Sequence, residues 1–173
     1  MPARATKPKE KSLSGFIKYY IKLVNPYLSD GDIDQIATSL LKWTKDRGVN
    51  LFSCMAIMQR ESSFYPNPPG STISKGLFQL TRYALDELVN KGYIKNYDWD
   101  KLTDIDYNIS LGTLYYLYCA RLAKNNRREA IARYRKTSNP DSPTAQAYAS
   151  SVLKIRDKIV QEYQKYKNTG GVK

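Results

Sequence analysis

The chain has 173 residues, enough for one domain with an apolar core, and no apolar run in it approaches the length that crosses a membrane. It carries 28 Lys and Arg residues against 16 Asp and Glu, a net charge of +12, so its surface attracts polyanions, of which nucleic acid is only one class. Because the sequence has no histidine and only two cysteines, Cys54 and Cys119, it excludes zinc-type ligand clusters and histidine-dependent catalysis. We therefore expect no metal and no cofactor. The cysteines either pair in an oxidising compartment or, as the simpler interpretation, stay buried as thiols.

The amino-terminal residues 1–12 are rich in Lys and Pro and poor in large apolar groups, which predicts a disordered basic tail. We expect residues 13–168 to form one domain and residues 169–173 to be a flexible end. Lys18 and Lys22 interrupt the first apolar stretch, so no secretory signal is evident.

Capping residues and apolar spacing predict three helices in the first part of this domain. The second of these has acidic Asp30 and Asp32 in its first turn and is stopped by Gly48. The helices are expected over about 14–25, 30–47 and 51–62, with Ser14, Ser29 and Asn50 as their caps.

The second part of the domain is expected to be helical after an irregular loop. Pro and Gly residues between 66 and 70 mark this loop, and at most a small β element is expected near residues 64–79. Further helices are expected over 82–91, about 106–124, 127–135 and 143–166, with Thr81 and Ser142 as caps of the first and the last. The pattern predicts an all-α globule with minimal β structure.

Glu61 is the carboxylate with the most informative position. It lies at the end of an apolar helix, after the segment 54–58, and just before the aromatic, Pro-rich loop. Partial burial and the negative end of the helix both disfavour a carboxylate anion, and a protonated carboxyl there is suited to donate a proton to a glycosidic oxygen. A Glu at a helix end is by itself more often a solvated cap, so this interpretation depends on the surrounding residues.

Several segments, in order along the chain, resemble the motifs of one enzyme family. Residues 58–64 read MQRESSF and residues 75–80 read KGLFQL, and together they resemble the soluble lytic transglycosylases, whose first two motifs are Glu-Ser and Gly-Leu-Met-Gln. Residues 108–117 are similar to the family's helix after the active-site lobe, residues 130–134 resemble its third motif, Ala-x-Tyr-Asn, and Tyr148 matches the tyrosine of its last motif. The resemblance covers most of the chain.

This resemblance implies a lysozyme-like fold of the goose-lysozyme type, a helical globule with a substrate cleft, and lytic cleavage of peptidoglycan. In that chemistry Glu61 protonates the oxygen of the β-1,4 bond between N-acetylmuramic acid and N-acetylglucosamine. The resulting carboxylate then takes the proton from the muramoyl C6 hydroxyl, which closes a 1,6-anhydro ring in place of attack by water. One carboxyl that acts first as acid and then as base explains why no second catalytic carboxylate is needed.

The resemblance also implies roles for residues around the catalytic carboxyl. Ser62 and Tyr134 are expected to hold and polarise that carboxyl by hydrogen bonding, and Tyr148 to line the cleft wall. Gln79 is expected to bind substrate amide or hydroxyl groups, and Phe78 to pack on a sugar ring. Each residue also has a purely structural alternative, as a helix end, a loop stabiliser or a core aromatic.

Other acidic and aromatic residues are interpreted as structural. Asp104 and Asp106 are expected to be helix caps rather than a second acid. Trp99 and Tyr65 are expected either in the cleft or in packing at its rim.

Two motif positions depart from the family pattern. Phe78 stands where the family has Met, which keeps an apolar group there, and Arg135 stands where it has Asn. If the family Asn contacts substrate or fixes its loop, Arg135 is expected to alter binding, product choice or activity.

Three other functions are compatible with the sequence. A muramidase of the goose-lysozyme type would use water in place of the C6 hydroxyl. A basic helical protein that binds nucleic acid is favoured by the net charge of +12 but by no motif. A non-catalytic, wall-binding relative is suggested by Arg135.

The expected partner is the glycan strand of peptidoglycan, without specific nucleic-acid binding and without a membrane span. We expect a monomer that acts outside the cytoplasm, in the periplasm or the cell wall, either alone or within a secretion or cell-envelope assembly.

Overall fold

The structure is a computed structural model that describes residues 12–135 and 139–169. Apart from Ser12, the expected tail 1–12 lies outside these residues, and so does the segment 170–173 of the expected flexible end. The described residues form the α-helices α1 (Leu13–Val24), α2 (Asp30–Arg47), α3 (Leu51–Ser62), α4 (Arg82–Asn90), α5 (Ile105–Leu122), α6 (Arg127–Tyr134) and α7 (Pro143–Asn168). A short 3-10 helix, η1 (Asp100–Thr103), precedes α5. The all-α architecture predicted from the sequence is confirmed.

Side-chain caps set the beginnings of the helices. The Ser29 hydroxyl accepts a hydrogen bond from the Asp32 amide at 3.1 Å, and the Asn50 side chain accepts one from the Ser53 amide at 2.9 Å, as their sequence positions predict. The predicted cap of α1 is wrong by one half-turn, because Ser12 rather than Ser14 accepts from the Gly15 amide.

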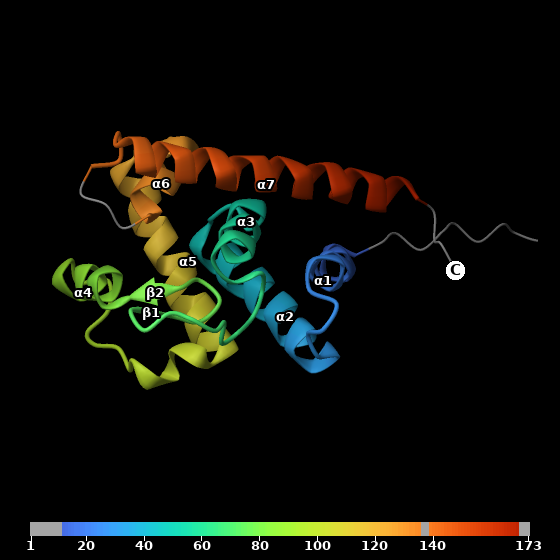
Figure 1. Cartoon of the computed structure of the whole chain (residues 1–173), viewed down its shortest axis with the longest axis horizontal. Coiled ribbons are helices and arrows are strands. Elements are labelled where there is room, and N and C mark those ends of the chain that lie inside the picture. Colours follow the sequence, from blue (N-terminus) through green and yellow to red (C-terminus); the bar gives the residue numbers. More distant parts are fainter. Residues whose placement is uncertain (1–11, 136–138, 170–173) are drawn as a thin grey trace, which may run out of the picture.

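The helices pack in a layered arrangement in which α7 runs along one edge of the molecule (Figure 1). It packs across α3, α6 and α1, while α5 packs along α2 and α6. Helix α3 is buried over a continuous stretch from Ser53 to Met58, and it is covered by α7 on one side. After this stretch the last turn of α3 reaches the surface, where Glu61 is partly exposed.

The β structure is limited to a two-stranded antiparallel hairpin, β1 (Ser74–Lys75) with β2 (Leu80–Thr81). This agrees with the predicted small β element, although β2 lies just after the predicted range. A hairpin this short is not stable by itself. It is held to α5 by the buried Asn108 side chain, which accepts from the Phe78 amide at 2.9 Å and donates to the carbonyls of Lys75 and Leu102.

The two acidic residues at the start of α5, Asp104 and Asp106, have different structural roles. Asp104 caps the helix by accepting from the Tyr107 amide at 2.8 Å, as predicted. Asp106 is not a cap: its carboxylate accepts from the Ser39 hydroxyl at 2.8 Å and from the Trp43 indole at 2.9 Å. It therefore ties α2 to α5, a contact between distant segments that capping rules do not predict.

The two cysteines do not form a disulfide. Cys54 and Cys119 are both buried thiols, the simpler of the two interpretations of the sequence. Burial raises the pKa of the Cys54 thiol, which makes it unreactive in the folded state.

Among the described residues, no helix is both long enough and apolar enough to span a membrane.

Candidate active site

Glu61 lies on the rim of a cleft of about 600 Å³. It occupies the last turn of α3, and the chain turns sharply just after it, because Ser63 and Phe64 both have a left-handed backbone with φ of 49° and 64°. The fully buried Phe64 ring anchors this turn in the core. Burial of the helix and of the following aromatic residue thus leaves Glu61 at the edge of the cleft.

The cleft is lined by side chains from several separate segments. The residues are Glu61, Thr72, Ile73, Ser74, Thr81, Arg82, Tyr83, Trp99 and Arg135. In the described part of the chain, Glu61 is the single carboxylate in this lining. No group of three or more His, Cys, Asp or Glu side chains within the described ranges could hold a metal ion. The site therefore presents one acid facing hydroxyl, aromatic and cationic groups.

Tyr148 on α7 holds the Glu61 carboxyl. Its hydroxyl donates to Glu61 Oε1 at 2.5 Å, across 87 residues of sequence. Burial, and then the charge of Glu61, raises the pKa of Tyr148 well above its ordinary value, so the phenol stays protonated and remains the donor. Tyr148 is only 6% exposed, and it lines a second pocket rather than the cleft wall predicted for it.

Ser62 and Tyr134 act on the neighbouring backbone instead of donating to Glu61 as predicted. The Ser62 hydroxyl donates to the carbonyls of Met58 at 3.0 Å and Leu77 at 2.8 Å, which joins the end of α3 to the segment before β2. The Tyr134 hydroxyl donates to the Phe78 carbonyl at 2.9 Å. Burial, and then the charge of Glu61, raises the pKa of Tyr134 well above its ordinary value. Both residues thereby fix the segment that faces Glu61.

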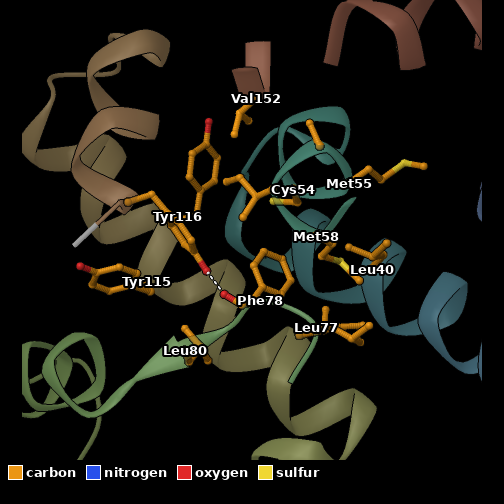
Figure 2. Close-up of a cluster of buried hydrophobic side chains, with 14 of the residues drawn as sticks. Leu40, Cys54, Met55, Met58, Leu77, Phe78, Leu80, Tyr115, Tyr116 and Val152 are labelled. Carbon is orange, nitrogen blue, oxygen red and sulfur yellow. Dashed lines mark hydrogen bonds between the residues drawn. The ribbon is translucent and has the colours of Figure 1, made fainter. Parts of the chain in front are cut away.

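Phe78 belongs to the core and not to the cleft surface. Figure 2 shows its ring inside the hydrophobic cluster, near Met58 and Leu77, and the side chain is 0% exposed. It packs against Gly112 of α5, where an added Cβ would lie 2.2 Å from Phe78 Cγ. The predicted packing of Phe78 on a sugar ring is therefore corrected, because no face of the ring is available to a ligand.

Gln79 stabilises the hairpin in this structure. Its side chain is 7% exposed and accepts from the Ser74 hydroxyl at 2.7 Å while donating to the Gly76 carbonyl at 2.9 Å. Its backbone has a φ of 44°, in the left-handed region that disfavours most side chains. These contacts correspond to the structural alternative for Gln79, the satisfaction of loop backbone groups.

Trp99 is a wall of the cleft. The guanidinium of Arg82 lies 4.3 Å from the centre of the Trp99 ring, and the Lys75 ammonium lies 5.1 Å from it. These cation–π contacts hold the indole in place at the cleft edge. Ile73 and Tyr83 line the same cleft and are strongly exposed, a feature that the sequence pattern does not predict.

The helical packing around this cleft, with Glu61 at the end of a buried helix, is a lysozyme-like arrangement. The family model described as the Transglycosylase SLT domain matches residues 38–168. The chain belongs to this family.

Comparison with solved structures shows the same fold. An inactive mutant of the lytic transglycosylase Slt from Pseudomonas aeruginosa aligns with a TM-score of 0.63 and 22% identity, over 83% of this chain and 28% of that one. The 70-kDa soluble lytic transglycosylase from Escherichia coli aligns with a TM-score of 0.63 and 19% identity, over 95% of this chain and 32% of that one. A complex of a 70-kDa soluble lytic transglycosylase with bulgecin A aligns with a TM-score of 0.65 and 19% identity, over 95% and 33%.

The chain thus spans about a third or less of the length of these solved proteins. No curated protein matches it.

Proposed function

We propose that this chain is a peptidoglycan lytic transglycosylase that cleaves the β-1,4 bond between N-acetylmuramic acid and N-acetylglucosamine. The observation that carries the proposal is the position of Glu61, the single carboxylate lining the cleft within the described residues, held by the Tyr148 hydroxyl. Membership of the transglycosylase family supports the same reaction.

The hydrogen bond to Tyr148 supports different roles for the two carboxyl oxygens of Glu61. Because the protonated Tyr148 donates to Oε1, the acidic proton of Glu61 belongs on Oε2, the oxygen left to face the glycosidic bond. Proton transfer from Oε2 to the leaving oxygen releases the N-acetylglucosamine end. The new carboxylate keeps the Tyr148 hydrogen bond, which stabilises it until it takes a proton in the second step.

In the second step the Glu61 carboxylate removes the proton from the C6 hydroxyl of the muramoyl ring, and the C6 oxygen closes onto C1. The product is a 1,6-anhydro ring, and the proton returns to Glu61. A single carboxyl thereby serves as acid and then as base, in accord with a cleft lining in which the described residues supply no second one. We propose that the enzyme acts on glycan strands in the periplasm or the cell wall.

Product analysis of purified peptidoglycan tests this function directly. Wild-type protein should release muramoyl ends that are one water lighter than reducing ends, as detected by mass spectrometry. Glu61→Gln should lower the rate by about 10²- to 10⁴-fold or more, because amides do not transfer protons in this way. Glu162→Gln, which removes a carboxylate on α7 that is paired with Lys165, is the matched control and should retain activity.

Two results would contradict the proposal. Release of reducing muramoyl ends alone would make the protein a muramidase that uses water. Absence of cleavage by wild-type protein that is folded, as judged by circular dichroism, would leave the non-catalytic wall-binding function.

A further inference from the structure

A second pocket lies beside Tyr148, the residue whose hydroxyl bonds to Glu61. Its volume is about 490 Å³, and it is lined by Arg60, Arg135, Pro143, Thr144, Ala147 and Tyr148. Arg135 lines both this pocket and the main cleft, so the two are adjacent. Tyr148 also links the two, because it lines this pocket while its hydroxyl bonds to Glu61, which lines the main cleft.

Two cations converge on this pocket without a neutralising partner. The guanidinium carbons of Arg60 and Arg135 lie 6.0 Å and 5.8 Å from the centre of the Tyr148 ring. In the described part of the chain, neither guanidinium forms an ion pair with a carboxylate. Arg133, only two residues before Arg135, is by contrast paired with Glu129 at 2.7 Å. Two unpaired positive charges at one pocket attract an anion.

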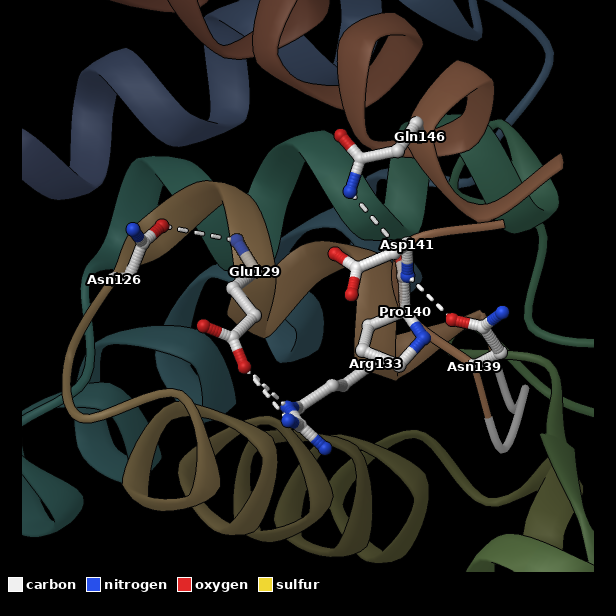
Figure 3. A network of polar contacts seen from close by, with 7 residues as sticks. All are labelled: Asn126, Glu129, Arg133, Asn139, Pro140, Asp141 and Gln146. Atoms are coloured by element: carbon white, nitrogen blue, oxygen red, sulfur yellow. Dashed lines mark hydrogen bonds and ion pairs between the residues drawn. The ribbon is translucent and has the colours of Figure 1, made fainter. Parts of the chain in front are cut away.

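The start of α7 adds to this positive environment. The pocket includes Pro143 and Thr144 in the first turn of this 26-residue helix, whose N-terminal end carries partial positive charge. A side chain of α7 holds the residues just before this helix: Gln146 donates to the Pro140 carbonyl at 2.9 Å, as Figure 3 shows. Asp141, the acidic residue among them, does not line the pocket.

We propose that this pocket is a subsite for a carboxylate of the substrate, bound by Arg60 and Arg135 beside the reacting bond. The inference rests on the proposed function and extends it to the substituent of the muramoyl ring. That ring carries a lactyl group, which ends in a carboxylate when bare and bears carboxylates along the peptide stem when substituted. The sugar ring whose glycosidic bond is protonated by Glu61 therefore carries an anionic substituent.

Arg135 distinguishes this subsite from the family pattern. It stands where the family motif has Asn, and a neutral amide cannot supply the charge or the forked pair of donors that a guanidinium offers to a carboxylate. We therefore expect Arg135 to shift substrate preference toward strands with free carboxylates.

The test compares glycan strands that differ in the carboxylates they carry. The first substrate has intact stems, the second has stems whose carboxylates are converted to amides with carbodiimide and ammonia, and the third has its stems removed by an amidase to leave lactyl carboxylates. Wild-type kcat/KM should be higher on the first than on the amidated strands by about tenfold or more, the size expected for a charge-assisted hydrogen bond. The double variant Arg60→Gln with Arg135→Gln should lose this preference.

Charge-preserving and remote variants make the comparison specific. Arg60→Lys with Arg135→Lys should retain part of the preference, since charge remains but the forked donors are lost. Lys154→Gln with Lys158→Gln removes two exposed charges further along α7 and should leave the preference unchanged. The third substrate identifies the source of the anion. Preference for stripped strands over amidated strands indicates the lactyl carboxylate, and preference confined to intact strands indicates the stem.

Equilibrium binding in a Glu61→Gln background separates this inference from the proposed function. Tighter binding of carboxylated than of amidated strands, abolished by the two Gln substitutions, supports the subsite even if wild-type protein cleaves nothing. Cleavage with an undiminished preference in the double variant overturns the subsite while leaving the enzyme intact. Equal binding of both strands in the Glu61→Gln protein also overturns it.

Discussion

The hydroxyl of Tyr148 and the carboxyl of Glu61 meet at 2.5 Å although they lie 87 residues apart, on α7 and α3. The packing of α7 against α3 brings them together, and the buried tyrosine keeps its proton because burial raises its pKa. The hydrogen bond therefore orients one carboxyl oxygen, and the proposed mechanism uses the other. A mobile glutamate at the end of a helix would lack this orientation.

Tyr148→Phe should lower kcat on peptidoglycan by about 10²-fold, because misplacement of a reacting group is costly even when its chemistry is unchanged. The remaining phenyl ring still fills the space between α7 and α3, so the melting temperature should change little. Tyr163→Phe, a partly buried tyrosine on the same helix that stacks on Phe16, is the matched control. Equal activity of Tyr148→Phe and wild type would mean that the hydrogen bond has no catalytic role.

Asn108→Ala should destabilise the protein by about 3 kcal/mol, because it leaves buried backbone groups of the hairpin without partners. The lost contacts are those with the Phe78 amide and with the carbonyls of Lys75 and Leu102. Urea unfolding measures the loss. Asn90→Ala, at the exposed end of α4, should stay within about 0.5 kcal/mol of wild type. A loss of similar size in both variants would contradict the anchoring role of Asn108.

Gly112→Ala should lower the free energy of unfolding by about 1–3 kcal/mol through overpacking. The new Cβ would lie 2.2 Å from Phe78 Cγ, and both residues are buried in the core. The same substitution at Gly31, in the exposed first turn of α2, meets only Ser29 Oγ at 3.9 Å and should be neutral or slightly stabilising. Thermal unfolding of the two variants side by side gives the comparison, and an unchanged Gly112→Ala melting temperature would rule out close packing there.

Stability should decline at alkaline pH because buried tyrosines resist ionisation. Burial raises the pKa of Tyr20 to about 12, whereas an unfolded tyrosine titrates near pH 10. Below about pH 10 both states hold the proton and stability is fully present; between there and about 12 the unfolded state loses it first, so stability falls as pH rises. Tyr20→Phe should flatten this decline in urea unfolding series, and Tyr27→Phe, at an exposed position, should not.

The helices could be predicted from sequence because their ends depend on neighbouring residues. Ser29, Asn50 and Gly48 act within one turn of their own positions: Ser29 and Gly48 set the two ends of α2, and Asn50 sets the start of α3. The first helix differs because Ser12 and Ser14 are both plausible caps, and the choice between them depends on how the helix faces the core. Local rules do not contain that information.

The candidate site could be predicted only in part because its contacts are long-range. Family motifs put Glu61 and Tyr148 among the site residues, but the bond between them depends on the packing of α7 on α3. The prediction that Phe78 lies on the cleft surface is wrong because an apolar residue in a motif can equally well contact a ligand or belong to the core. The anchoring by Asn108 has no local signal, since its partners are main-chain groups up to 33 residues away.

Both cysteines of the chain are sealed in the interior, Cys54 on α3 and Cys119 on α5. A folded molecule therefore has no thiol at its surface through which two copies could become cross-linked in an oxidising compartment. Alkylating reagents reach these sulfurs only when the helices separate, so the speed of alkylation reports how often the core opens. The alkylation rate of the two native thiols thus measures how often this protein unfolds, without any added label.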